Sequence, residues 1–255
     1  MKIAVATHKA YQMPQSDIYL PVQSGAELQK EDLGYAKDNT GDNISIKNKN
    51  YSELTAIYWL WKNVQSDYKG VAHYRRHFSK KQTLFFTKGE FQDVIEQQEL
   101  EALLQDVDII LPKLRHYYIE TLASHYKHTH FEQDLTVTEK VIEQLYPEYL
   151  TSYHEVLQRK SGHMFNMFIM KDDYFDQYCE WLFSILFELE KQLDISDYNP
   201  FHARVFGRVS ELLLDVWITK NQIRYKEVPV IFMEEQNWYL KCKKFLQAKL
   251  LNKKY

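Results

Sequence analysis

The sequence predicts an α/β fold, in which helices flank a mixed, mostly parallel sheet and the C-terminal part is helical. Three observations support this fold class. Residues 2–7, KIAVAT, form a β-branched and alanine-rich run that is typical of a buried strand. Residues 52–63 carry apolar side chains at helical spacing, and the apolar residues 70–72 then begin another strand. Strands that alternate with helices in this way are typical of βαβ units.

Length, charge and cysteine content exclude several classes of protein. A chain of 255 residues predicts one large domain, or one domain with an appendage. The net charge of −3 argues against general nucleic-acid binding, because a basic excess supplies most of that affinity. Cys179 and Cys242 lie far apart and in no Cys-x-x-Cys pattern, so we expect neither a disulfide framework nor a thiolate zinc site. Residues 1–12 lack the apolar core of a secretory signal, and no apolar run is long enough to span a membrane, so we expect an intracellular protein.

The end of the first strand is a candidate for ligand contact. Thr7 ends this strand, and His8 and Lys9 follow at its carboxyl end, where nucleotide-binding sheets touch their ligand. An ordinary strand-end turn explains His8 and Lys9 equally well. Residues 11–42 then form a long polar connection, and such connections are often functional. Asn43 belongs to the polar segment 42–48, which predicts either a contact with ribose or sugar hydroxyls or a turn network.

Glu53, near the start of the helix predicted over 52–63, has two possible roles. Asn50 or Ser52 is its expected cap. Glu53 falls in the first turn, where the helix dipole favours a negative charge. That position gives Glu53 a structural explanation, and a catalytic role is the alternative.

Residues 70–78, GVAHYRRHF, form the stretch around which the rest is organised. Five polar residues follow its apolar start, namely His73, Tyr74, Arg75, Arg76 and His77. Arginine presents a planar fork of donors that fits phosphate oxygens, so a diphosphate or another anionic group is the expected ligand at this strand end. There are two alternatives. The arginines pair with acidic residues of neighbouring helices, or they belong to a surface patch that contacts another protein. Successive strand residues point to opposite faces, so both arginines face one ligand only if the strand has ended or bulged there.

The chain contains one Asp-x-Asp, at Asp106-Val107-Asp108. It lies between a helix predicted over 90–105 and a strand predicted over 109–111. Many sugar-nucleotide transferases hold their metal with Asp-x-Asp at the carboxyl end of a strand. Here the motif precedes its strand, so we expect a helix-to-strand turn instead of a metal site.

Three histidines lie close together in the sequence at His125, His128 and His130. His125 and His128 are neighbours on a helix, whereas His130 points elsewhere. A metal site needs a third convergent ligand and support around it. A polar surface that binds the acceptor, or a solvated helix end, is therefore the preferred explanation.

Asn166 interrupts the apolar run 163–170, HMFNMFIM. Burying its amide without partners would be costly, so Asn166 is either hydrogen-bonded to the backbone or exposed at a site that binds a sugar or the acceptor. The long helix predicted over 173–193 is rich in aromatic residues, and this stripe belongs to the core.

Glu211 lies in the helix predicted within residues 197–220. On the ligand-facing edge of that helix its carboxylate would act as a general base. If it pairs with Arg204, Arg208 or Arg75, its role is structural.

The C-terminal part ends in two segments. Residues 226–233 predict a short strand, at an edge of the sheet because of Pro229. Residues 238–255 contain six lysines and no acid, interleaved with apolar residues, so we expect a basic amphipathic helix on an anionic membrane surface. A helix docked on the domain by its leucines is the alternative. The predicted organisation is thus a single domain over 1–237 followed by this helix.

Four ordered blocks of the sequence closely resemble one family. They are NISIKNKNYSELTAIYWLWKN, GVAHYRRHF, HMFNMFIMKDDYFDQYCEWLFSILFELE and RVFGRVSELLLDVW. Over roughly residues 2–234 the chain resembles the DUF4422 family, whose members are encoded among genes for bacterial capsular and exopolysaccharide synthesis. The family is regarded as one of glycosyltransferases, with members assigned as galactofuranosyl or related hexosyl transferases.

The resemblance implies a GT-A-like nucleotide-sugar-binding α/β sandwich. It also implies transfer of a hexosyl unit from a UDP-sugar, with UDP-galactofuranose or UDP-galactose as the first candidate, to a lipid-linked saccharide at the cytoplasmic membrane face. Family-typical residues in this chain are Asn43, Glu53, His73, Tyr74, Arg75, Arg76, Asn166 and Glu211. A typical metal-dependent GT-A enzyme has Asp-x-Asp where this chain has His73-Tyr74-Arg75. Either His73 helps to bind a divalent metal, or the arginines neutralise the leaving diphosphate without one, and we favour the second.

These observations lead to a hypothesis with specific roles. Glu211 or Glu53 takes the proton from the acceptor hydroxyl, and the arginine pair holds the diphosphate. Thr7 and His8 lie near the base and ribose. A non-catalytic glycan- or lipid-binding accessory protein of a polysaccharide assembly complex is the alternative, suggested by the missing Asp-x-Asp and the basic tail. A nucleotide hydrolase, which needs no acceptor, is a more remote alternative.

Overall fold

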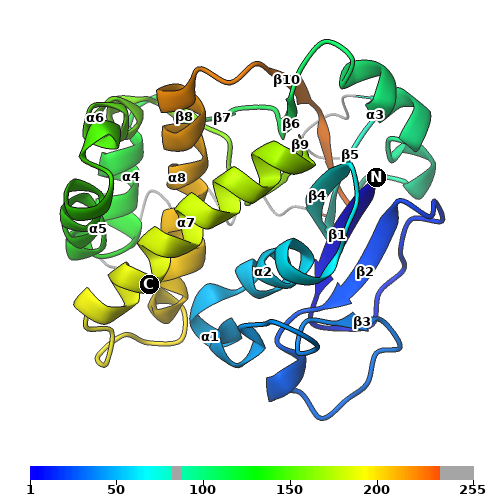
Figure 1. The fold of residues 1–255 in the computed structure, drawn as a ribbon, viewed down its shortest axis with the longest axis horizontal. Helices are drawn as coiled ribbons and strands as arrows, with labels where there is room; N and C mark the ends of the chain where they lie inside the picture. Colours follow the sequence, from blue (N-terminus) through cyan, green and yellow to red (C-terminus); the bar gives the residue numbers. More distant parts are fainter. Residues whose placement is uncertain (82–87, 236–255) are drawn as a thin grey trace.

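The computed structural model describes residues 1–81 and 88–235 (Figure 1). The basic helix predicted over 238–255, with its role at a membrane, lies outside the described residues. The described chain folds as a sheet with helices packed against both of its faces. Within the two described ranges, no helix is both long enough and apolar enough to cross a bilayer.

A nine-stranded sheet forms the centre of the described chain. Its strands are β1 (Lys2–Thr7), β2 (Tyr19–Gln23), β3 (Ala36–Lys37), β4 (Tyr68–His73), β5 (Arg76–Phe78), β6 (Ile109–Pro112), β9 (Phe168–Lys171), β10 (Tyr225–Val228) and β11 (Val230–Phe232). The main path runs β10-β6-β9-β4-β1-β2-β3, and β5 pairs with β4 and with β11 beside it. Every strand of the main path runs in one direction except β9, which is antiparallel to β4 and β6. The prediction of a mixed, mostly parallel sheet is therefore confirmed.

Helices cover the sheet unequally. The longer ones are α2 (Leu54–Asn63), α3 (Gln97–Leu103), α4 (Leu122–Thr129), α5 (Glu132–Leu145), α6 (Leu150–Gln158), α7 (Asp172–Gln192) and α8 (Val205–Asn221). In β1, Ala4 and Ala6 belong to the larger core with α2, α7 and α8, whereas Ile3 and Val5 belong to a smaller core with α3. This alternation follows from the two-residue period of a strand, so both faces of β1 are buried.

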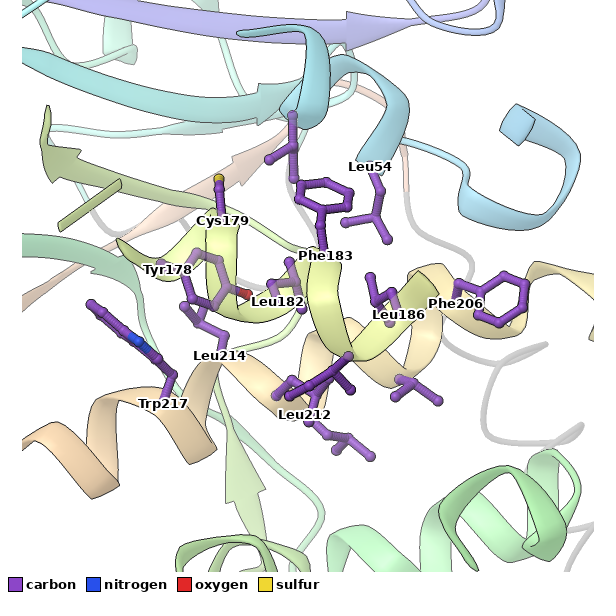
Figure 2. Close-up of a cluster of buried hydrophobic side chains, with 14 of the residues drawn as sticks. Leu54, Tyr178, Cys179, Leu182, Phe183, Leu186, Phe206, Leu212, Leu214 and Trp217 are labelled. Carbon is purple, nitrogen blue, oxygen red and sulfur yellow. The ribbon is translucent and has the colours of Figure 1, made fainter. Parts of the chain in front are cut away.

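The larger core fixes the position of α8. Figure 2 shows apolar side chains of α2, α7 and α8 gathered together, among them Leu54, Leu182 and Leu212. Burying a side chain of this size stabilises the fold by about 1.5–3 kcal/mol. Because α8 is buried along most of its length, its remaining polar residues are held in fixed positions beside the sheet.

One predicted helix is shorter than expected. The structure has a single 3-10 turn, η3 (Phe91–Asp93), and then α3 (Gln97–Leu103) in place of a helix over 90–105. Between them the backbone pairs with the edge of the sheet, since Ile95 N donates to Phe78 O at 3.0 Å. Glu96 then begins the helix with a capping box, so a tertiary pairing has overridden the helical periodicity.

The strand predicted over 226–233 is divided at Pro229. Residues before the proline form β10, at the edge of the sheet beside β6, and residues after it form β11, which pairs with β5. Proline has no N–H to donate to a ladder, so the chain changes partner there. The expected edge position is confirmed for β10.

The topology brings two of the predicted strand ends together. β1 and β4 are parallel neighbours, with Ala6 opposite His73. Tyr74 N then donates to Ala6 O at 3.2 Å. Residues that follow β1 and β4 therefore lie side by side at the carboxyl edge of the sheet.

Candidate functional site

The arginine pair lies in a tight turn. β4 ends at His73 and β5 begins at Arg76, so the strand has ended before either arginine. Arg75 is exposed, lies over the Tyr74 ring at 5.0 Å and pairs with Glu234 at 3.1 Å. Arg75 thus has an acidic partner, although that partner follows β11 and belongs to no neighbouring helix.

Arg76 has a different environment. Its guanidinium carbon lies 4.5 Å from the centre of the Phe165 ring and 5.7 Å from that of Phe232. Its Nε is buried without a hydrogen-bond partner, and Arg76 forms no ion pair with any described residue. A buried guanidinium N–H without an acceptor is unusual, because such groups are normally satisfied. The arrangement favours an anionic ligand as the missing acceptor.

A strained turn at Phe165 and Asn166 lies beside Arg76. Both residues have positive φ, 83° and 50°, which is uncommon outside glycine and is found most often where function requires it. Phe165 O accepts a hydrogen bond from His73 Nε2 at 2.5 Å, and Phe165 N donates to Glu211 Oε1 at 3.2 Å. Burial lowers the pKa of His73, so its ring is neutral and Nε2 carries the proton. The backbone N–H and C=O of Phe165 thus connect the carboxylate on α8 to the end of β4.

Asn166 holds the second carboxylate. Its Nδ2 donates to Glu53 Oε1 at 2.7 Å and to Gly207 O at 2.9 Å. Its Oδ1 accepts from Ser210 Oγ at 2.8 Å, and the side chain is buried. The predicted direct contact with a sugar or acceptor does not suit a buried amide that is already engaged. We therefore assign Asn166 to positioning Glu53.

Glu53 and Glu211 face the same region. Glu53 directly precedes α2, where the helix dipole favours its negative charge, and it makes no side-chain capping bond. Glu211 is half-buried on α8. Burial, and then the negative charge of Glu53, raises the pKa of Glu211 to about 7. Positive charges at Arg76, Arg115 and Arg208 oppose this rise without cancelling it.

Three arginines that the sequence did not single out as ligand-binding complete the site. Arg204 and Arg208 lie at the start of α8, and Arg115 lies on β7 (Arg115–His116), which forms a small ladder with β8 (Ser161–Gly162). Arg204 Nε donates to Ser52 Oγ at 2.8 Å. Among described residues, none of these three forms an ion pair. The spacing of Arg204, Arg208 and Glu211, four and then three residues, places them on one helical face and is the signal that could have found them.

Arg208 is held by an aromatic group. Its Nη1 donates to His130 Nε2 at 3.2 Å and its Nη2 to Phe201 O at 3.2 Å. Its guanidinium also lies over the Phe201 ring at 4.1 Å, while its Nε is buried without a hydrogen-bond partner. Arg208 therefore resembles Arg76: positioned by the protein, with donor capacity left for a ligand.

The residues at the end of β1 reach the edge of this group. Thr7 is buried and its Oγ1 donates to Lys9 O at 2.6 Å, so its hydroxyl serves the turn. His8 is exposed against the Tyr74 ring. Partial loss of solvent around its ring, and then the charges of Arg75, Lys9 and Arg204, lower the pKa of His8, which keeps it neutral near pH 7. Donor contacts at these positions stay a prediction.

Asn43 belongs to a turn. Its Nδ2 donates to Gly41 O at 2.9 Å, and its Oδ1 accepts from Ser45 N at 3.2 Å. These bonds organise the segment before α1 (Asn48–Tyr51). They match the turn network that the sequence offered as the alternative to a contact with ribose.

His125 and His128 come together on a buried acid. Both Nδ1 atoms lie close to the Glu120 carboxylate, at 3.3 and 2.8 Å. His125 also lines a cavity of about 130 Å³, together with Arg115, Tyr117, Leu122, Tyr126, Thr129, His130, Met164, Arg208, Glu211 and Leu212. His125 and Glu211 therefore line the same cavity, whereas His128 stays outside it.

The expected turn at the Asp-x-Asp is confirmed. Asp108 lies just before β6, where Lys171 Nζ binds it at 2.6 Å and Arg224 at 3.6 Å. This is the opposite edge of β6 from its carboxyl end. In the described ranges no cluster of three histidine, cysteine or acidic residues has the arrangement of a metal site.

Comparison with known proteins agrees with this architecture. Residues 2–222 match the family described as a domain of unknown function, DUF4422. The chain belongs to the DUF4422 family. Its fold matches the apo structure of WbbM, a bifunctional glycosyltransferase, with a TM-score of 0.83 and 32% sequence identity over 92% of this chain. The match covers 45% of WbbM, so this chain spans about half the length of that protein. No curated protein matches the chain.

The match with WbbM also confirms the expected fold class, an α/β fold in which helices flank a mixed, mostly parallel sheet. The family and the fold therefore agree with the resemblance found in the sequence blocks. Neither comparison assigns a role to individual residues.

Proposed function

We propose that the chain is a glycosyltransferase that moves a hexosyl unit from a UDP-sugar to a lipid-linked saccharide in capsule or exopolysaccharide synthesis. Galactofuranosyl or galactosyl is the first candidate for the unit transferred. The fold shared with a glycosyltransferase supports the class of reaction. The donor, the acceptor and a place at the inner face of the membrane come from the family resemblance and are part of the proposal.

One observation carries the proposal: arginines that form no ion pair within residues 1–81 and 88–235 lie around two carboxylates at the carboxyl edge of the sheet. Arg76 and Arg208 each keep a buried Nε without a partner. Ligands of open α/β sheets bind at this edge, and guanidinium groups match phosphate oxygens. A nucleoside diphosphate would supply the missing acceptors, and the same positive charge would stabilise it as a leaving group.

Glu211 is the proposed general base. A base is most effective when its pKa lies near the working pH, and the pKa of Glu211 is about 7. Glu53, held by Asn166, supplies the negative charge that helps to keep this value high. Glu211 also lines the cavity, so an acceptor hydroxyl there would lie within its reach.

The polar residues of the site do not suit a divalent metal. His73 donates its Nε2 proton to Phe165 O, and Glu53 accepts from Asn166. The surrounding side chains are mostly guanidinium groups, which repel a cation. We therefore route no step through a metal and propose that the arginines balance the diphosphate charge.

A transfer assay tests the proposal. Purified chain is incubated with UDP-galactofuranose or UDP-galactose and a lipid-linked saccharide, and release of UDP and elongation of the acceptor are followed. We expect turnover in the native chain and its loss in Glu211→Gln, with UDP binding retained. Absence of turnover with competent donors and acceptors, but with glycan or lipid binding, would instead support the accessory-protein alternative.

A further inference from the structure

Tyr118 and Ile119 form an exposed apolar tip beside the cavity that contains Glu211. The exposed fraction is 78% for Tyr118 and 64% for Ile119. Tyr118 also has a φ of 56°, in the left-handed region, which is unfavourable for a residue with a Cβ. Two large apolar side chains in water and a strained backbone at one place are unfavourable in the isolated chain. Such strain is found mainly at sites of contact and function.

The tip is held out by the backbone on both sides of it. Tyr117 N donates to Lys160 O at 2.8 Å, and Leu122 N donates to Arg159 O at 2.8 Å. Ile119 N donates to Tyr117 O at 2.6 Å, which closes the turn. Together with the β7–β8 ladder, these bonds make the tip a fixed projection of the fold.

The surroundings of the tip are basic. Residues 113–119, KLRHYYI, and residues 158–162, QRKSG, contain four lysines and arginines and no acidic residue. The next acid, Glu120, is buried against two histidines. Arg159 pairs with Glu155 at 2.6 Å, whereas Lys160 forms no ion pair with a described residue. An apolar tip within a basic surface complements an anionic bilayer, because apolar insertion and charge attraction then act together.

We propose that Tyr118 and Ile119 insert into an anionic membrane surface and turn the cavity toward the bilayer. Arg115 and Tyr117, from the same segment, line that cavity with Glu211. A saccharide could therefore enter the cavity while its lipid stays in the membrane. Entry of a lipid-linked saccharide into the cavity rests on the proposed function, whereas contact of the tip with a membrane can be measured without it.

Vesicle co-sedimentation of the full chain tests the contact. Vesicles of phosphatidylcholine alone are compared with vesicles that also contain phosphatidylglycerol. We expect binding to the anionic vesicles, and binding roughly tenfold weaker when Tyr118→Ser and Ile119→Ser are combined, because apolar insertion is lost. Lys160→Gln should weaken binding about fivefold, as expected for one basic residue near an anionic surface.

Ile46→Ser is the matched control. Ile46 is 61% exposed, on η2 (Ser45–Lys47) before α1, which lies well away from β7 (Figure 1). We expect its vesicle binding to equal that of the native chain. All variants carry residues 236–255 unchanged, so differences between them report on the tip.

Two outcomes would overturn the inference. They are no binding to either kind of vesicle, and equal binding by the native chain and the double variant. If the double variant does not fold, Lys160→Gln decides in its place. UDP binding is measured on the same samples. If the native chain binds anionic vesicles but not UDP, the proposed function is contradicted and the membrane contact still holds.

Discussion

Asn166→Ala should lower the free energy of unfolding far more than the same substitution at an exposed asparagine. The substitution removes three hydrogen bonds, to Glu53, Gly207 and Ser210. The bond to the half-buried Glu53 carboxylate contributes about 1.5 kcal/mol and each neutral bond about 1 kcal/mol. Ser210 Oγ keeps a second partner in Gly207 O, at 2.8 Å, which offsets part of the loss. We therefore expect a decrease of about 3 kcal/mol in the free energy of unfolding.

Chemical denaturation with urea measures this decrease, and calorimetry should show a fall of about 6–12 °C in Tm for a chain of this size. Asn63→Ala is the matched control, since Asn63 also makes three hydrogen bonds, to Asp42 N, Asp42 O and Trp59 O, but is exposed. Its loss should stay near 1 kcal/mol or less, because water replaces the lost partners. Equal effects of the two variants would refute the positioning role that we assign to Asn166.

Further predictions concern the two carboxylates. Glu211→Gln should lower the transfer rate by about 10²–10⁴-fold, measured as UDP release, whereas unimpaired turnover would remove Glu211 as the base. In the native chain kcat/KM should rise as pH increases through about 7, where Glu211 loses its proton. Glu53→Gln removes a like charge, so the midpoint of that rise should move to lower pH; an unchanged midpoint would contradict the coupling. The pKa of Glu211 in the folded chain lies above its usual 4.5, so the folded chain binds this proton more tightly than the unfolded chain does. The free energy of unfolding should therefore fall as pH is raised from about 4.5 to 7. This fall should disappear in Glu211→Gln.

Local sequence patterns were sufficient for much of the fold. The β-branched run at 2–7 and the start of the stretch at 70–78 were recognised as strands, whereas their pairing, with Ala6 opposite His73, is seen only in the structure. Pro229 correctly marked an edge, since loss of one N–H acts locally. Where the expectation was wrong, at 90–105, a distant strand edge had taken the backbone bonds that a helix would have used.

The site itself depended on contacts between distant residues. Glu211 and Asn166 were identified, but the bond from Asn166 to Glu53 spans 113 positions and no local pattern indicates it. Arg115 joins the cavity through the β7–β8 ladder, which pairs segments that the sequence left as connections. The strained φ values at 165 and 166 are likewise a product of the surrounding packing.

The central claim is that guanidinium groups, in place of a metal, hold the diphosphate of the donor. Calorimetric titration with UDP, with and without Mn²⁺, tests it most directly in the native chain, Arg75→Ala, Arg76→Ala and the control Arg224→Ala, an exposed arginine paired with Asp108. We expect binding that needs no metal, is weakened about 10–100-fold by Arg76→Ala and is unchanged by Arg224→Ala. Binding that requires Mn²⁺, or that is as tight in Arg76→Ala as in the native chain, would contradict the account.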